Sequence, residues 1–467
     1  MKLAVALLVV IYLPGWGQDL GSLKRVDVPQ PSGLDKYVAD RAMLVALGKA
    51  LFWDMQAGSD GRLACASCHF HAGADHRSRN QLAHSTISFP VNHLLIPEDF
   101  PFHVLSNSNN NRSAVLRDSA VVAGSAGVFR RIFKDVVALS ATDDGFDSGD
   151  TPAFSLNGIN VRRVTTRNTP TVINSVYYVR NFWDGRARSV FTGFTPFGES
   201  DVRENALVVA EGRARLERVR VENSSLASQA VGPPLNGIEM SYDGRTWPKL
   251  GKKMLGLRPL ALQRVAPDDS VRGPLANPDG PGLAANFTYR GMVQAAFKPE
   301  YFASASLFDV QGREVAGVAP PQSTNEFTQA EFNFALFWGL ALQAYQSTLI
   351  SDDSPFDQFS DGDSSALSAE QQQGLRIFRT QAGCTNCHVG PEFTAASFTS
   401  VARRGETQGA GNGRRRDTGF FRIGVRPIDD DAGIGADDDL GQPLSVVLGD
   451  RSGVAGAFKT PTLRNVE

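Results

Sequence analysis

Two copies of one short pattern constrain this chain more than any other feature. Cys65-Ala66-Ser67-Cys68-His69 and Cys384-Thr385-Asn386-Cys387-His388 each place a histidine directly after two cysteines spaced three apart. The two motifs contain all 4 cysteines of the 467-residue chain, and histidine is scarce, with 7 in all. A scarce residue that recurs at the same position of both motifs is not expected by chance. The repeat therefore indicates two sites with the same chemistry.

The pattern Cys-x-x-Cys-His is typical of covalent attachment of c-type haem. The two thiols bond to the porphyrin, and the adjacent imidazole reaches the iron as its proximal ligand. A structural zinc site would instead need four N or S ligands converging from both pairs. A thioredoxin-like redox pair does not require the trailing histidine. The predicted ligands of two haem c groups are Cys65, Cys68 and His69, and Cys384, Cys387 and His388.

The N-terminus predicts export. Lys2 precedes an apolar run from Leu3 to Leu13 and a small-residue site at 15–17, which together read as a secretory signal peptide over residues 1–17. The apolar run is shorter than the roughly 20 residues needed to cross a bilayer, although an uncleaved membrane anchor is the alternative reading. In a Gram-negative cell the mature protein would be periplasmic. The formal net charge of −2 gives no general attraction to nucleic acid.

Each motif follows a predicted helix, which is the arrangement of a cytochrome c domain. Residues 39–55 carry leucines at helical spacing, and Ser368 with Gln371 forms a capping box that starts the second helix. A further long helix is predicted over 328–349. We therefore expect a mostly α-helical fold with two cytochrome c-like haem domains.

The domain boundary is placed in the polar, turn-rich stretch 351–365. This gives an N-terminal haem domain over 18–355, which includes long loops, and a C-terminal haem domain over 356–467. Within this organisation we interpret 187–228 and 265–285 as insertions, and the charge runs 414–416, 429–431 and 437–439 as solvated loops.

Several longer segments resemble one known family. They read LGKALFWDMQAGSDGRLACASCH, RNTPTVINSVYYVRNFWDGRA, LASQAVGPPLNGIEM and FKTPTLRNV, in this order along the chain. Together they resemble the bacterial di-haem cytochrome c peroxidase family, which includes the di-haem enzyme that matures the tryptophylquinone cofactor of methylamine dehydrogenase. The resemblance covers most of residues 40–467. It implies that hydrogen peroxide binds at the N-terminal haem and that electrons enter at the C-terminal haem.

The resemblance also implies the residues around the peroxide. Glu239 and Gln229 match a glutamate, and a glutamine ten residues earlier, that line the distal face of the N-terminal haem. A carboxylate beside the iron can move the proton that O–O cleavage requires, and a neutral amide can orient the peroxide. Trp183 matches a tryptophan that lies between the two haems and shortens the electron path.

Further expectations concern a cation and the partners. Asn168 matches an asparagine that holds a calcium ion between the domains, and the backbone carbonyls of Thr460 and Thr462 would complete the shell, which is chemistry that suits this hard cation. The resemblance implies a small cytochrome c or cupredoxin as the electron donor, and it leaves a homodimer open.

Two departures from the family pattern concern the sixth ligands of the irons. Residues 150–167 contain no histidine, although the resemblance implies a distal histidine there in many members. Apart from the two motif histidines, the chain has only His71, His76, His84, His93 and His103. We therefore expect the first haem to be open on its distal side, unless one of these histidines reaches it.

The stretch after His388 contains no Met, His or Tyr. We therefore expect a truncated C-terminal domain whose haem lacks a defined sixth ligand.

The function expected from these features is that of an exported di-haem peroxidase that reduces hydrogen peroxide to water. Two alternatives stay open. One is a di-haem oxidase of a protein or small molecule, of the cofactor-maturing type. The other is a non-enzymatic di-haem electron carrier or redox sensor, which would not respond to peroxide.

Overall fold

The computed structural model describes most of the chain downstream of the predicted signal peptide. The described residues are 20–77, 81–82, 96–99, 101, 103–110, 112–118, 123–147, 155–156, 158–203, 205–411, 413–424, 428–429 and 431–466. The predicted signal peptide, His84 and His93 lie outside these residues. None of the helices in the described ranges is long and apolar enough to cross a membrane.

The largest elements are helices. They are α1 (Arg41–Trp53), α2 (Ser225–Ala230), α3 (Trp247–Leu255), α4 (Tyr289–Ala296), α5 (Gln329–Phe332), α6 (Phe334–Gln346), α7 (Pro355–Ser360), α8 (Ala369–Arg379) and α9 (Phe398–Arg404). The expected helix over 328–349 is thus divided at Asn333, which caps the first piece and begins the second. The capping box of Ser368 and Gln371 is present at the start of α8, as predicted.

Strands form only small antiparallel sheets in the described part of the chain. The two-stranded pairs are β1 (Gln81–Leu82) with β4 (Ala123–Gly124), β2 (His103–Leu105) with β3 (Val115–Asp118), β5 (Ala126–Phe129) with β10 (Arg162–Val164), β6 (Ile132–Asp135) with β7 (Asp144–Phe146), β8 (Ser155–Leu156) with β9 (Ile159–Asn160), β11 (Ala206–Ala210) with β12 (Arg213–Glu217), β16 (Thr407–Gly411) with β17 (Arg414–Asp417), and β18 (Phe420–Phe421) with β19 (Phe458–Lys459). A three-stranded sheet has the order β14 (Glu314–Val318), β13 (Ser306–Phe308), β15 (Phe327–Thr328). The fold is therefore one of helices joined by long connections and hairpins.

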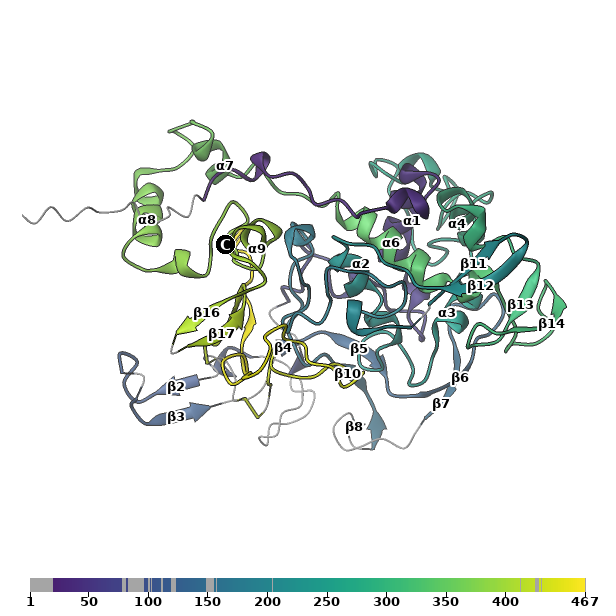
Figure 1. Cartoon of the computed structure of the whole chain (residues 1–467), viewed down its shortest axis with the longest axis horizontal. Helices are drawn as coiled ribbons and strands as arrows, with labels where there is room; N and C mark the ends of the chain where they lie inside the picture. The colour runs from purple at the N-terminus through teal and green to yellow at the C-terminus, as the bar shows by residue number, and fades with distance from the viewer. Residues whose placement is uncertain are drawn as a thin grey trace, which may run out of the picture.

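Helix α6 is the centre of the N-terminal core. It is apolar on nearly all sides, as expected of a helix that is surrounded by protein. Helices α1, α2 and α3 pack around it, and α4 packs on the outer side of α1 (Figure 1). The closest approach is at Gly48 of α1, where an added Cβ would lie 1.9 Å from the carbonyl oxygen of Ala341. Glycine is therefore required for α1 to reach the position from which it leads into the first motif.

The segment interpreted as an insertion, 187–228, belongs to this core. Its residues Ala187, Phe191 and Val221 are fully buried, and the hairpin β11–β12 also lies within it. Phe191 packs against Gly339 of α6, where a side chain would collide with the ring. The segment is thus a structural part of the N-terminal body.

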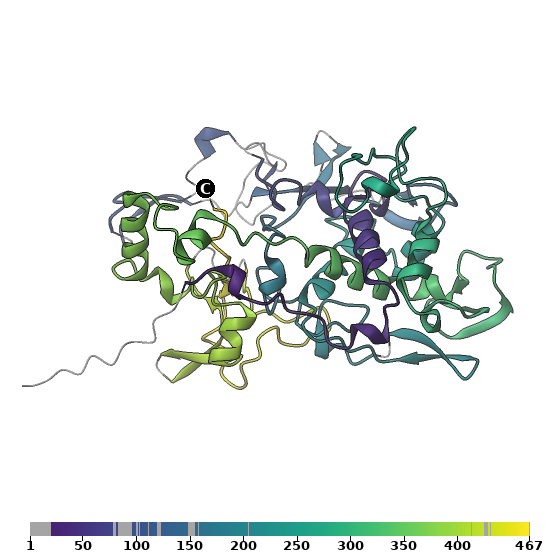
Figure 2. The ribbon, with the colours of Figure 1, turned by 90° about the horizontal axis from the view of Figure 1, so that it is seen from above.

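The C-terminal part is built differently. A small apolar cluster of residues between Phe420 and Ala457 forms its core, and α8 has no buried residue at all. Figures 1 and 2 show α7 and α8 on the side of the molecule away from α1 and α4. The charge run 414–416 was expected to be a solvated loop. It is part of strand β17, in which Arg414 and Arg415 are exposed to solvent.

Contacts between the two parts of the chain are specific. The carboxylate of Asp357 in α7 accepts a hydrogen bond from the backbone N–H of Leu23 at 2.8 Å. Within the C-terminal part, Asp357 is held by a buried bidentate ion pair with Arg464, at 2.6 and 2.8 Å. The backbone N–H of Lys459 donates to the carbonyl of Trp183 at 2.8 Å. The Trp183 segment is thus held directly by the C-terminal part.

Replacing Gly48 by alanine tests the packing of α1 on α6. The added methyl cannot fit beside Ala341, so we expect the free energy of unfolding to fall by about 1–3 kcal/mol. Gly374, in the middle of α8, has no atom within 4 Å of an added Cβ, so its change to alanine serves as the control. That control should be neutral or stabilise the protein by up to about 1 kcal/mol. Thermal unfolding of the holoprotein, followed by circular dichroism, measures both. Equal melting temperatures for the two variants would contradict the close contact.

Candidate active site

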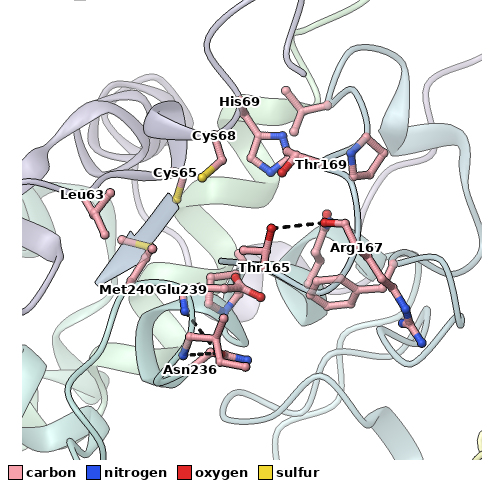
Figure 3. Close-up of a pocket in the computed structure, with 18 of the residues that line it drawn as sticks. Leu63, Cys65, Cys68, His69, Thr165, Arg167, Thr169, Asn236, Glu239 and Met240 are labelled. Atoms are coloured by element: carbon pink, nitrogen blue, oxygen red, sulfur yellow. Dashed lines mark hydrogen bonds between the residues drawn. The ribbon is translucent and has the colours of Figure 1, made fainter. Parts of the chain in front are cut away.

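The first motif opens into a cavity of about 180 Å³ that is partly continuous with solvent. Residues from distant parts of the sequence line it, and those proposed from the sequence are Cys65, Cys68, His69, Asn168, Trp183, Gln229 and Glu239. Figure 3 shows Cys65, Cys68 and His69 on one side of this cavity and Glu239 on the other. The fold thus gathers all of the expected N-terminal site residues into one space.

His69 is held in the form that binds a metal. Its Nδ1 lies 2.8 Å from the carbonyl oxygen of Gly73, so Nδ1 carries the proton and donates it. Burial lowers the pKa of His69, against the raising effect of the Gly73 carbonyl, which favours neutral imidazole. The Nε2 lone pair is then available to an iron atom, with the ring orientation fixed by the backbone.

The two cysteines beside it lie on the short 3-10 turn Cys65–Ser67 and just after it. Both are free of disulfides. Burial raises the pKa of the Cys65 thiol to about 12 and that of the Cys68 thiol to about 11. Such thiols are not reactive redox thiolates, which have a lowered pKa. Their position at the cavity wall fits covalent attachment of a porphyrin.

Backbone contacts place Glu239 on the opposite wall. Its N–H donates to Asn236, and its carbonyl accepts a hydrogen bond from the N–H of Val128 in β5 at 3.1 Å. Gly127 permits this contact, because a Cβ there would lie 1.7 Å from the carbonyl oxygen of Ile238. The loop that carries Glu239 is therefore pressed against β5, and the side chain projects into the cavity.

A buried network of ion pairs also holds the loop that carries Glu239. Arg245 and Asp143 are both 0% exposed and pair at 2.9 Å, and Lys253 of α3 reaches Asp143 at 3.0 Å. Arg245 also donates to the carbonyls of Ala57 and Pro234. The network ties the turn after α1 to the loop before Glu239. Breaking a buried ion pair of this kind costs about 3–5 kcal/mol.

The carboxyl group of Glu239 is suited to proton transfer. Burial raises its pKa above the ordinary value, and the positive charge of Arg186 opposes the shift. A glutamate tuned upward in this way can accept and return a proton closer to neutral pH. Gln229 extends the same wall from α2 and also lines the cavity.

Trp183 lines the cavity next to an arginine network. Its indole N–H donates to the backbone carbonyl of Asn168 at 2.9 Å. Asp184 pairs with Arg167 at 2.6 Å and with Arg186 at 2.8 Å, and Arg167 also pairs with Asp431 of the C-terminal part at 2.7 Å. Trp183 is therefore held between the first motif and the C-terminal part of the chain.

The other histidines of the described residues do not reach this cavity. His71 and His76 stack on each other with ring centroids 3.7 Å apart, and both are exposed. His103 is exposed in β2. Among the described histidines, His69 is the one that lines the cavity.

The second motif repeats the local geometry of the first. Cys384 and Cys387 lie in and just after the 3-10 turn Cys384–Asn386, and Nδ1 of His388 lies 3.2 Å from the carbonyl oxygen of Phe393. The neighbouring helix α8 leaves apolar side chains uncovered, with Ile377 41% exposed. A flat apolar group attached at the motif would cover such a face. The residues present therefore fit a second covalent haem.

The alternative of a zinc site finds no support in the described residues. Within them, no group of three or more His, Cys, Asp or Glu side chains is arranged to hold a metal ion.

The calcium site expected from the sequence stays a prediction. Asn168 is exposed beside Trp183. The carbonyl of Thr460 accepts a hydrogen bond from the Thr394 hydroxyl at 2.7 Å, and the N–H of Thr462 donates to the Tyr178 hydroxyl at 2.6 Å. Asn168 and Thr460 thus both lie next to the Trp183 segment, from the two parts of the chain.

Two cysteines, an imidazole with a free nitrogen and a facing carboxyl group together fit a c-type haem site. Comparison with known proteins agrees. The family model described as di-haem cytochrome c peroxidase matches residues 42–116 and 141–365, which is more than half of the chain. The chain belongs to this family, whose members carry haem c.

Individual relatives come from both branches of the family. The chain is 25% identical to cytochrome c551 peroxidase of Pseudomonas aeruginosa over 224 residues, which is 48% of this chain and 36% of the relative. It is 34% identical to the methylamine utilization protein MauG of Methylophilus methylotrophus over 247 residues, which is 52% of this chain and 44% of the relative. These matches therefore span less than half the length of each relative.

A solved structure of a MauG-like protein associated with microbial copper homeostasis aligns with 97% of this chain and 76% of its own, at a TM-score of 0.40 and 15% identity.

Several cavity residues were not found from the sequence. Arg186, Asn236 and Phe52 line the cavity, and the ring of Phe52 lies 6.3 Å from that of His69. Phe52 and Arg186 stand in the segments FWD and FWDGR, so their motifs were visible although their roles were not. Asn236 carried no such signal, since a single asparagine in a loop is common.

Replacing each cysteine pair separately tests the two attachment sites. A C65A/C68A variant should lose one of two haems, because its remaining pair still binds one covalently. The C384A/C387A variant should lose the other, and intact mass after denaturation counts the haems that remain. Two haems in either double variant, or none in the unmodified chain, would contradict the assignment.

Proposed function

We propose that this protein reduces hydrogen peroxide to water at the haem held by His69, with electrons that enter at the haem held by His388. One observation carries the proposal, namely that Glu239 faces His69 across a cavity that Gln229 also lines. An electron carrier has no use for a buried carboxyl group in that place. The overall change is the reduction of one peroxide by two electrons and two protons to two molecules of water.

The residues of the chain would divide the work by their chemistry. The bound haem would supply electrons to the O–O bond. Glu239 would accept a proton from the oxygen of peroxide that lies nearer to His69 and return it to the departing oxygen. Gln229 would orient the peroxide by hydrogen bonding. His69, fixed by Gly73, would hold the proximal side.

Electron delivery would use the segment between the two parts of the chain. Trp183 lies on the cavity wall, and Lys459 of the C-terminal part donates a hydrogen bond to its backbone. This position supports a bridging role for the indole ring. The expected electron donor is a small cytochrome c or cupredoxin in the periplasm. The proposal also includes a homodimer. It further includes a calcium ion bound by Asn168, Thr460 and Thr462.

A second candidate is oxidation of a protein or small molecule by the same two haems. The similarity to MauG proteins, one of which is 34% identical over 52% of this chain, supports it as the second candidate. The two functions differ in the molecule that supplies electrons to peroxide. Steady turnover of peroxide with a reduced cytochrome or cupredoxin supports the peroxidase, and turnover that requires another substrate supports the oxidase.

The pH dependence of peroxide reduction tests the role of Glu239. The carboxyl group must be ionised to accept a proton, so the rate should fall as the pH drops through the raised pKa of Glu239. This acidic limb should lie above the ordinary glutamate value of about 4.3. In E239Q the limb should disappear and the rate should fall about 10²- to 10⁴-fold.

Arg186 provides a second test of the same limb. Its positive charge lowers the pKa of Glu239, so R186Q should move the limb to higher pH. Arg220 is an exposed arginine paired with Glu199 and Glu222, and R220Q should leave the limb in place. Stopped-flow rates of the reaction with peroxide give all three profiles. An acidic limb that persists unchanged in E239Q would assign it to another group.

A further inference from the structure

The hairpin β16–β17 buries two hydrogen-bond donors that have no acceptor. Gln408 and Arg416 are directly opposite each other in the antiparallel pair, so their side chains share one face of the hairpin. Within the described residues, Nε2 of Gln408 and Nε of Arg416 are buried and lack any hydrogen-bond partner. Both atoms can only donate. Buried polar groups without partners are rare, because their loss of hydration is not compensated. The pair therefore requires an acceptor.

A further arginine lies in the same neighbourhood. Arg404, the last residue of α9, is half-buried. Burial lowers its pKa, and the positive charges of Arg416 and Arg403 lower it further. Neither Arg404 nor Arg416 has a carboxylate partner among the described residues. Two like charges held close disfavour each other's charged form, and an anion between them would remove this repulsion.

The cluster of Arg404, Gln408 and Arg416 lies beside the second motif. The positive charges of Arg416 and Arg404 both act on the Cys387 side chain. The carbonyl of Cys387 accepts a hydrogen bond from Ala395, three residues before α9 begins. Figure 1 shows α9, β16 and β17 together on the α8 side of the molecule.

The neighbouring arginine on the same strand is satisfied. Arg415 points to the opposite face of β17, because side chains alternate along a strand. It is exposed and donates to the Thr407 hydroxyl and carbonyl, the latter at 3.0 Å. The donors without an acceptor therefore lie only on the face of the hairpin that carries Arg416.

We propose that Arg416, Gln408 and Arg404 bind a propionate carboxylate of the haem attached at Cys384 and Cys387. The proposal rests on the assignment of that haem. A carboxylate accepts several hydrogen bonds at once and pairs with guanidinium in a bidentate geometry. It supplies both the missing acceptor for Gln408 and Arg416 and the counterion for the arginine pair. The cluster would thereby hold the propionate ionised and set the potential of this haem.

The reduction potential of the second haem tests the proposal in the full-length holoprotein. Intact mass first confirms two covalent haems in every variant. In R416Q and R404Q the negative charge of the propionate is no longer compensated. This charge then stabilises the ferric state of the haem. The ferrous-to-ferric ratio at a fixed potential should therefore fall about tenfold, equivalent to about 59 mV for one electron.

The pH dependence should change as well. The arginines keep the propionate ionised in the unmodified protein, so its potential should stay constant through neutral pH. Their removal raises the pKa of the propionate, so the potential of R416Q should fall with rising pH in this range. The control R415Q should match the unmodified protein in both respects.

Three outcomes would overturn the proposal. R416Q and R404Q could match R415Q in potential and in pH profile. R416Q and R404Q could also match R415Q in potential and pH profile but lose the salt-dependent reaction with an acidic electron donor. That result would assign the arginines to a surface that binds a partner protein. If the unmodified chain carries no haem at Cys384 and Cys387, its mass shows this first, and the haem assignment itself fails.

If R416Q does not retain the second haem, R416K decides the matter. Retention in R416K supports a need for positive charge at this position. Loss in both variants would overturn the proposal, because a positive charge at position 416 would then not be what retains the haem.

Discussion

The buried network of Asp143, Arg245 and Lys253 is the interaction on which the proposed active site depends. It joins the turn that follows α1 to the loop that ends at Glu239, through charge-assisted hydrogen bonds to backbone carbonyls. Such a network is costly to bury and costly to break. The same two segments also meet directly, because Ser59 forms hydrogen bonds with the carbonyl of Met240 and the N–H of Tyr242, both at 2.9 Å. The distance between His69 and Glu239 is set by this connection together with the contact of Gly127 on Ile238.

The Trp183 segment has a corresponding role between the two halves of the chain. Asp184 gathers Arg167 and Arg186 on the cavity side, and Arg167 continues to Asp431. The same segment takes a backbone hydrogen bond from Lys459. One short stretch therefore lines the cavity beside the first motif and contacts the part of the chain that carries the second motif. The electron path that we propose would pass through this connection.

The two haem sites differ in how completely the protein encloses them. The first lies in a cavity surrounded by a large apolar core. The second lies near a helix with no buried residue and a hairpin with unsatisfied donors. Protein side chains alone bury most of the first site. At the second site the cofactor is needed to cover α8. As we propose, it also supplies a hydrogen-bond acceptor to Arg416. The C-terminal part would thus complete its structure around the cofactor.

The sequence by itself determined the chemistry of attachment. Cys-x-x-Cys-His fixes the ligands locally, since five consecutive residues carry the whole pattern, and the capping box at Ser368 likewise depends on neighbours in the chain. The course of helix 328–349 was also nearly right, because its apolar pattern is local. The family resemblance predicted that Glu239, Gln229 and Trp183 lie near the haem of His69, and all of them line its cavity. Tertiary structure alone decided that 187–228 is core and not an accessory loop, and that Arg416 lies opposite Gln408 in one hairpin. These facts depend on contacts between residues far apart in the chain, which no local pattern encodes.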